Sequence, residues 1–243
     1  ARGRMLIRLE LSKNLIKHGY FYHVFTLDFR GRAYTVCELL SPQSSDFDKA
    51  LACFANGVKV TEEGRRWQKV NLANLFDQDK VSLEDRVKWA DENWETFKRI
   101  KQDPYSNLEW VDDRKKKNKS FQRLAAIFDI LREDGMSYVP VQIDGNCNGS
   151  QHWAAIMKDQ SIGEKVGIVP SVLPPDLYQH IADSATEYCH LKKNEILWCK
   201  NFLDYWNEKI DRKITKRSTM CDPYGLTFYG IQKYLKIEGH LDW

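Results

Sequence analysis

The sequence contains no apolar run long enough to span a bilayer, and its N-terminus lacks the apolar core of a signal peptide. It also has no internal repeat and no low-complexity tract. The six cysteines are scattered without a CxxC pair, which argues against a zinc site built from them and against a disulfide framework. These absences predict a soluble, intracellular protein that does not enter a membrane.

The net charge of +3 is too small to identify a nucleic-acid-binding protein. Basic residues are nevertheless concentrated in the segments 2–17, 114–117 and 209–217. Such stretches can neutralise phosphate groups. For the middle run, which lies in a loop-like stretch, a solvated surface is the simpler interpretation.

Hydrophobic periodicity predicts a helix-rich protein of the α/β or α+β class. A hairpin is expected over 22–39, because two strand-like segments flank a turn at 30–32. A short strand is expected over 138–143, directly before an Asp-Gly pair, with Pro140 in an edge or irregular position. Helices are expected over 4–17, from Ser82 to Phe97, and over 121–131, 150–158, 176–190, 195–210 and 211–221.

Asp144 is the first candidate for chemistry. A carboxylate at the end of a strand, followed by a glycine that lets the backbone bend closely, is a natural ligand for Mg²⁺, which prefers a few protein oxygens and leaves room for phosphates. Most Asp-Gly pairs are simply turns, so this feature is weak evidence when taken alone.

Arg212 and Lys216 are four residues apart and therefore share one face of the predicted helix over 211–221, where both cations can reach one triphosphate. Such pairs are also common on solvated helix faces. Pro223 is expected to end the helix, with Tyr224 and Gly225 just beyond it. The whole pattern, R-x3-K-x7-YG, is far more specific than the basic pair.

The segment Asp28-Phe29-Arg30-Gly31-Arg32 places two arginines on the predicted hairpin turn. An exposed turn with an ion pair is the plain interpretation. The functional interpretation is a clamp on a nucleic-acid backbone, because the arginine fork suits phosphate.

Three motifs occurring in one order resemble the single-subunit, DNA-dependent RNA polymerases of phage and mitochondrial type. DFRGR (28–32) is similar to the DxxGR motif of that family, DGNCNGSQHW (144–153) to its motif A, and RKITKRSTMCDPYG (212–225) to its motif B. The resemblance extends from about residue 3 to residue 225. It implies a helix-rich α+β fold, a right-hand polymerase palm with part of the fingers, divided into a thumb-to-palm connecting helix (1–18), a palm (19–171) and the start of the fingers (172–243).

The resemblance implies DNA-templated RNA synthesis, in which a nucleotide is transferred from NTP to the RNA 3′-hydroxyl with two Mg²⁺ ions. Asp144 would be one of two catalytic aspartates that hold the ions, assisted by the Gly145 carbonyl. The ions would lower the pKa of the 3′-hydroxyl and stabilise the leaving pyrophosphate.

The resemblance also assigns substrate contacts. Arg212 and Lys216 would bind the triphosphate, with a contribution from Lys80. Tyr224 would guard the nucleotide site and sense the ribose, and Gly225 would permit its turn. Lys216 and Tyr224 are thereby grouped with Asp144 as catalytic residues.

The DNA template and the nascent RNA would be held near the active site by a further set of side chains. Arg32, Arg30 and Lys49 would contact the strands, and Tyr178 would line the template side. Gln151 and His152 are expected to brace motif A rather than to react.

The second catalytic aspartate of the family belongs to a later His-Asp motif, whereas only residues 226–243 follow Gly225 here. His240-Leu241-Asp242 does not match that motif. A missing C-terminal segment or a second polypeptide is therefore expected to supply the carboxylate, and the isolated chain is expected to be inactive. The resemblance favours the cytoplasm of a phage-infected cell over the mitochondrion.

Two alternatives stay open. A family A-like DNA polymerase shares the motif B pattern, but its motif A usually continues with a glutamate that rejects the 2′-hydroxyl, and residues 145–149 contain no carboxylate. A non-catalytic nucleic-acid-binding subunit derived from a polymerase would explain the missing second aspartate, but would not require the set of motif A and motif B residues.

Overall fold

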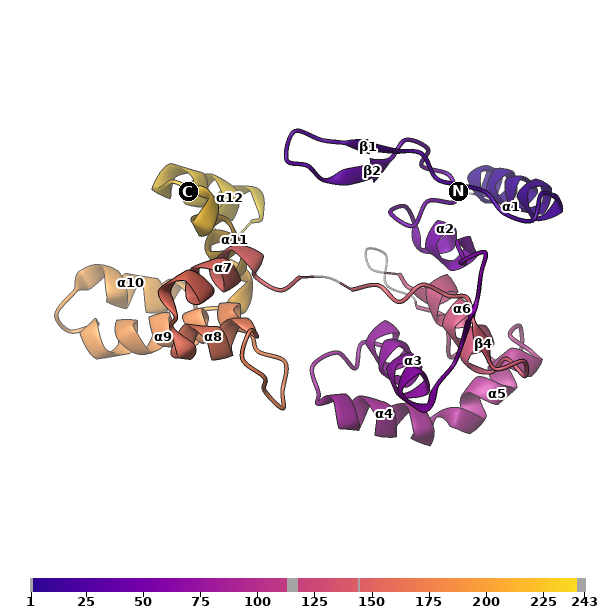
Figure 1. The fold of residues 1–243 in the computed structure, drawn as a ribbon. Helices are drawn as coiled ribbons and strands as arrows, with labels where there is room; N and C mark the ends of the chain where they lie inside the picture. The colour runs from indigo at the N-terminus through magenta and orange to yellow at the C-terminus, as the bar shows by residue number, and fades with distance from the viewer. Residues whose placement is uncertain (1, 113–117, 144, 240–243) are drawn as a thin grey trace. The chain divides into compact units, whose positions relative to one another are not determined.

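Helices dominate the chain, and its few strands form two-stranded antiparallel sheets, which confirms the helix-rich α+β class (Figure 1). The computed structural model describes residues 2–112, 118–143 and 145–239. The chain divides into unit 1 (Ala1–Gln142) and unit 2 (Ile143–Trp243). The division between units 1 and 2 is not the predicted boundary between palm and fingers at residues 171/172, which stays a prediction. None of the helices in the described ranges is long and apolar enough to cross a membrane.

Unit 1 is built around four helices, α3 to α6, in which α3 packs against α4 and α6, and α5 packs against α6 (Figure 1). Their inward faces form one core that includes Leu72, Phe97, Ile100 and Ile127, all almost fully buried. The helix expected from Ser82 to Phe97 begins where predicted, and the Ser82 hydroxyl accepts a hydrogen bond from the Asp85 amide. It ends at Glu92, however, and Phe97 belongs to a second helix that begins after Asn93. The elements of unit 1 are α1 (Arg2–Lys17), β1 (Phe25–Leu27), β2 (Ala33–Thr35), α2 (Asp46–Leu51), β3 (Val58–Lys59), α3 (Glu62–Leu75), α4 (Leu83–Glu92), α5 (Trp94–Gln102), α6 (Ser120–Ile130) and β4 (Met136–Ser137).

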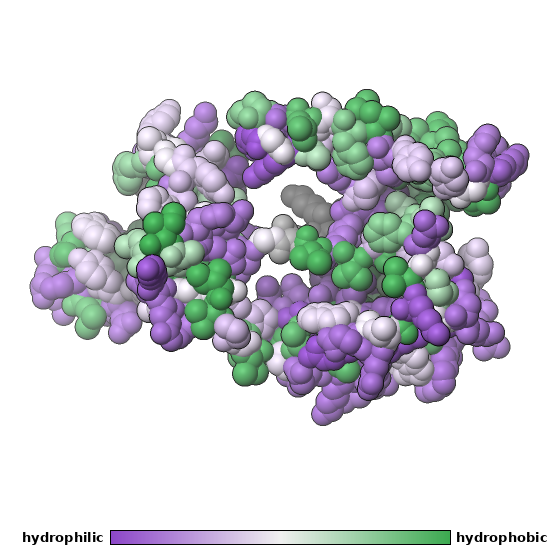
Figure 2. Space-filling view, in the orientation of Figure 1, coloured by the Kyte–Doolittle hydropathy of each residue, from purple (hydrophilic) through white to green (hydrophobic). Residues whose placement is uncertain are grey.

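The β1–β2 hairpin confirms the expected turn and pairs Phe25 with Thr35 and Leu27 with Ala33. Gly31 has a φ of +75°, a conformation that glycine adopts without strain. Hydrophobic residues gather along this hairpin in Figure 2, and Phe29 at its tip is 96% exposed. The hairpin therefore presents apolar rings as well as arginines at its surface.

Unit 2 contains smaller cores. One joins Ala182 of α9 to Ile210 and Ile214, and another joins Cys189 to Cys199 and Leu203 across the α9–α10 pair. The elements of this unit are α7 (Asn148–Met157), α8 (Gln160–Val166), α9 (Leu177–Lys192), α10 (Leu197–Tyr205), α11 (Arg212–Cys221), the 3₁₀ helix η1 (Asp222–Tyr224) and α12 (Phe228–Ile237).

The prediction of a strand over 138–143 is wrong. In this region β-pairing is confined to β4, which joins β3 in a two-stranded sheet, and the chain beyond Ser137 is irregular. The segment is apolar enough for a strand, but Pro140 has no amide hydrogen to donate, and a strand exists only where a second strand pairs with it. Asp144 itself lies outside the described residues.

Candidate functional site

Motif A forms a tight turn that leads into α7. Cys147, directly before the helix, is buried and has a φ of +40°. A left-handed conformation is costly for a residue with a side chain, and it persists only where the surroundings impose it. The turn that follows Asp144 is therefore a constrained part of unit 2.

The Val166 carbonyl at the end of α8 holds the start of α7 in place. Gln151 donates its side-chain amide to that oxygen at 2.8 Å, and the Cys147 thiol lies 4.0 Å from it. Gln151 thus braces motif A, as expected from the sequence. His152, on the next position of the helix, is exposed.

Motif B lies on α11, which begins where the Asp211 side chain accepts a hydrogen bond from the Lys213 amide. The helix is anchored by Ile214, which is buried against α9. It is also joined to α9 through Thr215, whose hydroxyl donates to the Tyr178 carbonyl at 2.8 Å. This packing fixes which face of α11 is directed away from the core.

Arg212 is oriented by two groups at the start of α9. Its Nε–H donates to the Asp176 carboxylate at 2.6 Å, and its guanidinium carbon lies 5.4 Å from the centre of the Tyr178 ring. Asp176 also caps α9 by accepting from the Gln179 amide. The pair is about one-third exposed, so solvent screens its attraction, and its main effect is to direct the guanidinium.

Tyr178 is buried beneath Arg212. Burial, with a smaller contribution from Cys147, raises the pKa of the Tyr178 phenol, although Arg212 opposes the shift. Burial, followed by the negative charge of Asp176, raises the pKa of the Cys147 thiol. Both groups are therefore neutral at physiological pH. The buried ring supports Arg212, and its predicted role on the template side stays a prediction.

Motifs A and B meet where α7 packs against η1. A Cβ atom placed on Gly149 would lie 2.7 Å from the Pro223 Cβ and 3.7 Å from Tyr224 Cζ. A glycine is therefore needed at position 149 for this approach. Tyr224 is 68% exposed, and Gly225 follows it with a φ of +81°. Pro223 ends α11, as expected.

Lys216 lies one helical turn beyond Arg212 and is exposed. Arg212, Lys216 and Tyr224 thus lie on one continuous segment of unit 2, and this segment contacts motif A at Pro223 and Tyr224.

In unit 1, the two arginines of the DFRGR turn differ in their contacts with Asp28. Asp28 accepts from Arg30 Nε at 2.9 Å and Nη2 at 2.7 Å, and also from the backbone amides of Arg30 and Arg32. Desolvation raises the pKa of Asp28, but these hydrogen bonds outweigh it and lower the pKa overall. Both arginines are exposed, but Arg30 is paired with Asp28 at 2.7 Å, and the side chain of Arg32 makes no such ion pair in the described part of the chain.

The two predicted lysines of unit 1 occupy different surroundings. Lys49 is half-buried on α2. Lys80 is 73% exposed on the α3–α4 loop (residues 76–82), with its Nζ 3.7 Å from Asp79 Oδ2. This geometry does not show what either lysine binds. The predicted contacts of Lys49 with nucleic acid and of Lys80 with the triphosphate therefore stay predictions.

Comparison with known proteins addresses the family directly. A family model described as DNA-dependent RNA polymerase matches residues 58–240. The chain belongs to this family.

The curated relatives are longer polymerases of mitochondrial and phage origin. The mitochondrial DNA-directed RNA polymerase of Neurospora crassa is 34% identical over 239 residues, which cover 94% of this chain and 16% of that protein. DNA-directed RNA polymerase 1, mitochondrial, of Arabidopsis thaliana is 30% identical over 253 residues, covering 96% of this chain and 25% of that protein. T7 RNA polymerase of Escherichia phage T7 is 28% identical over 252 residues, covering 93% of this chain and 28% of that protein. The chain therefore spans about a quarter or less of most relatives that it matches.

A Mg²⁺ site in this polymerase chain would depend on motif A. Gly145 is exposed and no atom lies within 4 Å of its Cβ position, so its backbone leaves room for a cation beside a hard carbonyl ligand. Among the described residues, no group of three or more His, Cys, Asp and Glu side chains could hold a metal ion. The metal site therefore rests on Asp144, outside the described residues, and stays a prediction.

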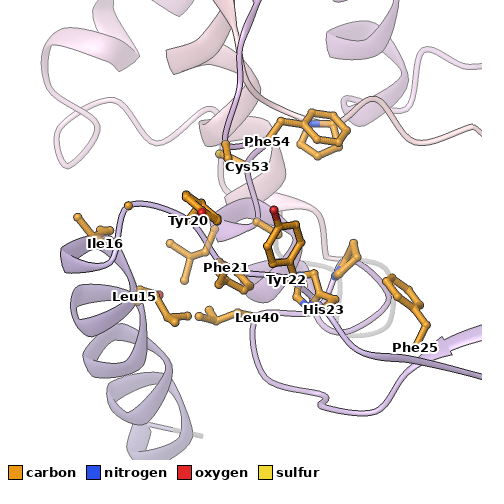
Figure 3. Close-up of a pocket in the computed structure, with 17 residues that line it drawn as sticks. Leu15, Ile16, Tyr20, Phe21, Tyr22, His23, Phe25, Leu40, Cys53 and Phe54 are labelled. Carbon is orange, nitrogen blue, oxygen red and sulfur yellow. The ribbon is translucent and has the colours of Figure 1, made fainter.

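A mainly apolar cavity of the polymerase chain lies within unit 1. It measures about 560 Å³ and is lined by Leu15 and Ile16 of α1, the aromatic segment 20–23 and Leu40 (Figure 3). No Asp, Glu, Lys or Arg is found among the described residues that line it. It is therefore not suited to binding a triphosphate.

Sequence reasoning missed Asp176, Thr215 and Gly149 as members of the site. Asp176 follows two prolines and precedes an apolar segment, a pattern that marks it as a helix cap but does not reveal its pairing with Arg212. The close approach of Gly149 to Pro223 depends on long-range packing, which no local pattern encodes.

Proposed function

We propose that this chain is part of a DNA-templated RNA polymerase and that motifs A and B of unit 2 form its nucleotide site. The observation that carries the proposal is the convergence of Gly149, on motif A, with Pro223 and Tyr224, on motif B, beside an oriented Arg212. Family membership supports the reaction class. The division into palm and fingers is part of the same proposal.

Arg212 and Lys216 would bind the triphosphate of the incoming nucleotide. Asp176 accepts the hydrogen bond from Nε–H of Arg212. The two terminal amino groups of the guanidinium are therefore the donors expected to bind phosphate oxygens. Lys216 adds a flexible point charge one turn further along α11. The two cations offset the negative charge that develops as pyrophosphate leaves.

Tyr224 would lie against the sugar of the bound nucleotide. It is exposed next to motif A, and residues 145–149 present only small or neutral side chains there. That segment contains no glutamate that would fill the space of a 2′-hydroxyl, which favours ribonucleotides over the DNA polymerase alternative.

Motif A would bind the Mg²⁺ ions through Asp144 and the Gly145 carbonyl, with a further carboxylate from outside this chain. When bound, the ions would supply activation of the 3′-hydroxyl and neutralisation of the leaving group.

The test is extension of an RNA primer on a DNA template with Mg²⁺ and ribonucleotides, using the polymerase preparation that contains this chain. Asp144→Ala is expected to abolish extension. Arg212→Ala and Lys216→Ala are each expected to raise the KM for NTP roughly tenfold or more, because each removes a charge-assisted contact to phosphate. Extension with deoxynucleotides in parallel separates the RNA and DNA polymerase proposals.

Lys213→Ala is the matched control, since Lys213 is an exposed base on the same helix but on a different face. It is expected to leave the KM for NTP unchanged. Equal extension by wild type and Asp144→Ala would show that the activity belongs to another protein, and absence of extension from both would favour a non-catalytic binding subunit.

The cellular compartment in which the protein acts is not decided by its relatives. Relatives of both mitochondrial and phage origin match the chain, so the preference for the cytoplasm of a phage-infected cell stays a prediction.

A further inference from the structure

The α3–α4 loop carries Lys80 away from the core of unit 1. Both members of the Lys80–Asp79 pair are largely exposed, and their charged atoms are 3.7 Å apart, so this contact is too weak and too screened to fix the Lys80 side chain. Any fixed placement of Lys80 must therefore come from the backbone of the loop.

Arg86, on α4, holds that backbone. Its guanidinium is buried, and it donates to the Val81 carbonyl through Nε at 3.1 Å and Nη2 at 2.9 Å. Nη2 also donates to the Asp79 carbonyl at 3.0 Å, and Nη1 donates to the Asn74 side chain at 2.9 Å. The two carbonyls flank Lys80, so one buried arginine fixes the residues on both of its sides.

Two further cations hold the beginning of the loop. Lys119 donates to the Asn74 carbonyl at 3.1 Å, and Arg123 donates to the Leu75 carbonyl at 2.9 Å, at the C-terminal end of α3 where cations are favoured. Both also contact the carboxylate of Asp77. Asp77 has a φ of +64°, a conformation that a residue with a side chain adopts only under constraint.

These contacts indicate a loop that is built to be rigid. Burial of an arginine is costly unless it is hydrogen-bonded, and here each guanidinium nitrogen of Arg86 donates to an oxygen of the loop or of the helix end before it. The cation that remains available to solvent at the tip of the loop is Lys80, beside the half-exposed carboxylate of Asp79.

We infer that Arg86 is a positioning residue for nucleotide binding: it holds the carbonyls on either side of Lys80 so that the lysine is presented to the phosphates of the incoming NTP. The inference rests on the proposed function and on the triphosphate contact that the family resemblance assigns to Lys80. Lysine at position 86 would keep the charge but could not reproduce the planar fork that reaches three acceptors.

The experiment compares Arg86→Lys, Lys80→Ala and the double variant in the polymerase that contains this chain. The expected result for Lys80→Ala and for Arg86→Lys is a KM for NTP raised about tenfold with little change in kcat. The double variant should be no worse than Lys80→Ala, because Arg86 acts through Lys80. Arg66→Ala is the matched control, since Arg66 pairs with Glu84 of α4 at 2.7 Å and lies outside the loop.

Hydrogen exchange of the chain gives a readout that does not depend on activity. Arg86→Lys should speed exchange of the Asp77 and Gln78 amides, which donate to the Asn74 and Ala73 carbonyls at 3.2 and 2.8 Å, about tenfold relative to wild type. The core amides of α5 and α6 should keep their protection. This also separates a local loss of order from a general failure to fold.

The outcomes distinguish the inference from the proposed function. If Lys80→Ala raises the KM but Arg86→Lys does not, or if the two effects multiply in the double variant, the inference is overturned and the role of Lys80 stands. If Lys80→Ala itself leaves the KM unchanged, both the role of Lys80 and the inference are overturned, while the assignments in motifs A and B are untouched.

Discussion

Units 1 and 2 bury their hydrophobic residues in different ways. The helices α3 to α6 of unit 1 share one core of seven buried residues, among them Phe97 and Ile127. Unit 2 has three smaller clusters, and no residue of α12 is fully buried. Elements that share one core open together, whereas elements held by small separate clusters open locally at lower free energy. The proposed nucleotide site thus lies on the less cooperative unit.

The largest expected effect is Phe97→Ala in unit 1. Phe97 is 1% exposed, and its ring lies 5.9 Å from the rings of both Phe76 and Trp89. Removing it should lower the free energy of unfolding by about 3–5 kcal/mol, because a cavity is left in a shared core. Denaturant unfolding combined with hydrogen exchange of α3 to α6 measures the loss.

Phe29→Ala is the control for this change, since Phe29 is 96% exposed in the same unit. It should alter the free energy of unfolding by less than about 0.5 kcal/mol. Similar losses for both variants, or a loss at Phe97 confined to α5, would contradict the picture of a single cooperative core.

The second prediction concerns Asp48, which is fully buried and ties α1 to α2. Its carboxylate accepts from Arg8 at 2.5 Å, from the Leu40 amide at 3.0 Å and from the hydroxyls of Ser44 and Ser45. Asp48→Asn leaves Arg8 without its charged partner and should cost about 3 kcal/mol, a typical loss for a broken buried pair. Thermal unfolding and exchange at α1 test it.

The Asp48 carboxylate should also make the free energy of unfolding depend on pH. Desolvation raises the pKa of Asp48, but the hydrogen bonds from Arg8 and its other donors outweigh this and lower the pKa below its usual value. The stabilisation should be complete above about pH 4, near the pKa of an unfolded aspartate, and be lost as pH falls through the lower folded-state pKa. Asp48→Asn should lack this part of the acid sensitivity. Glu10→Gln, at an exposed pair, should retain it; an unchanged acid profile in Asp48→Asn would count against the assignment.

The third prediction moves to unit 2. Gly149→Ala would place a methyl group 2.7 Å from the Pro223 Cβ, so the contact between α7 and η1 must yield. The expected cost is about 1–3 kcal/mol, typical of overpacking, and exchange should quicken in α7 and η1 rather than throughout the chain. Gly3→Ala, where a Cβ meets no atom within 4 Å, is the control. Wild-type protection in Gly149→Ala would mean that motifs A and B are not in close contact.

The smallest expected effects come from two identical helix caps. Thr61 caps α3 by accepting from the Gly64 amide at 3.0 Å, and Thr227 caps α12 by accepting from the Gly230 amide at 3.2 Å. Substitution by alanine should cost about 1 kcal/mol in each. Thr61→Ala should lower the global stability of unit 1, whereas Thr227→Ala should only speed exchange within α12. Identical exchange patterns would remove the distinction between the units.

Local sequence signals predicted the features that depend on local chemistry. Ser82 begins a helix, Gly31 permits the hairpin turn and Pro223 ends α11, because each acts through its own backbone and its near neighbours. The placement of Arg212 and Lys216 on one helix followed from their spacing alone.

Features that depend on distant partners were not predictable in the same way. The segment 138–143 has the composition of a strand, but β-pairing ends at Ser137. The pairing of Arg212 with Asp176 joins residues 36 positions apart, and Arg86 looks in the sequence like one charge on an exposed helix. Each is decided by which groups tertiary packing brings together, which a local pattern does not contain.

The DFRGR hairpin has a further consequence in terms of counterions. A cation releases counterions from nucleic acid only if its charge is available to a phosphate. Asp28 holds Arg30, whereas the side chain of Arg32 is exposed. Arg32→Ala should therefore reduce the slope of log affinity against log salt by about 0.7–0.9, and Arg30→Ala should reduce it far less. Of the two hairpin arginines, Arg32 is therefore the one expected to contribute a phosphate contact to the salt dependence.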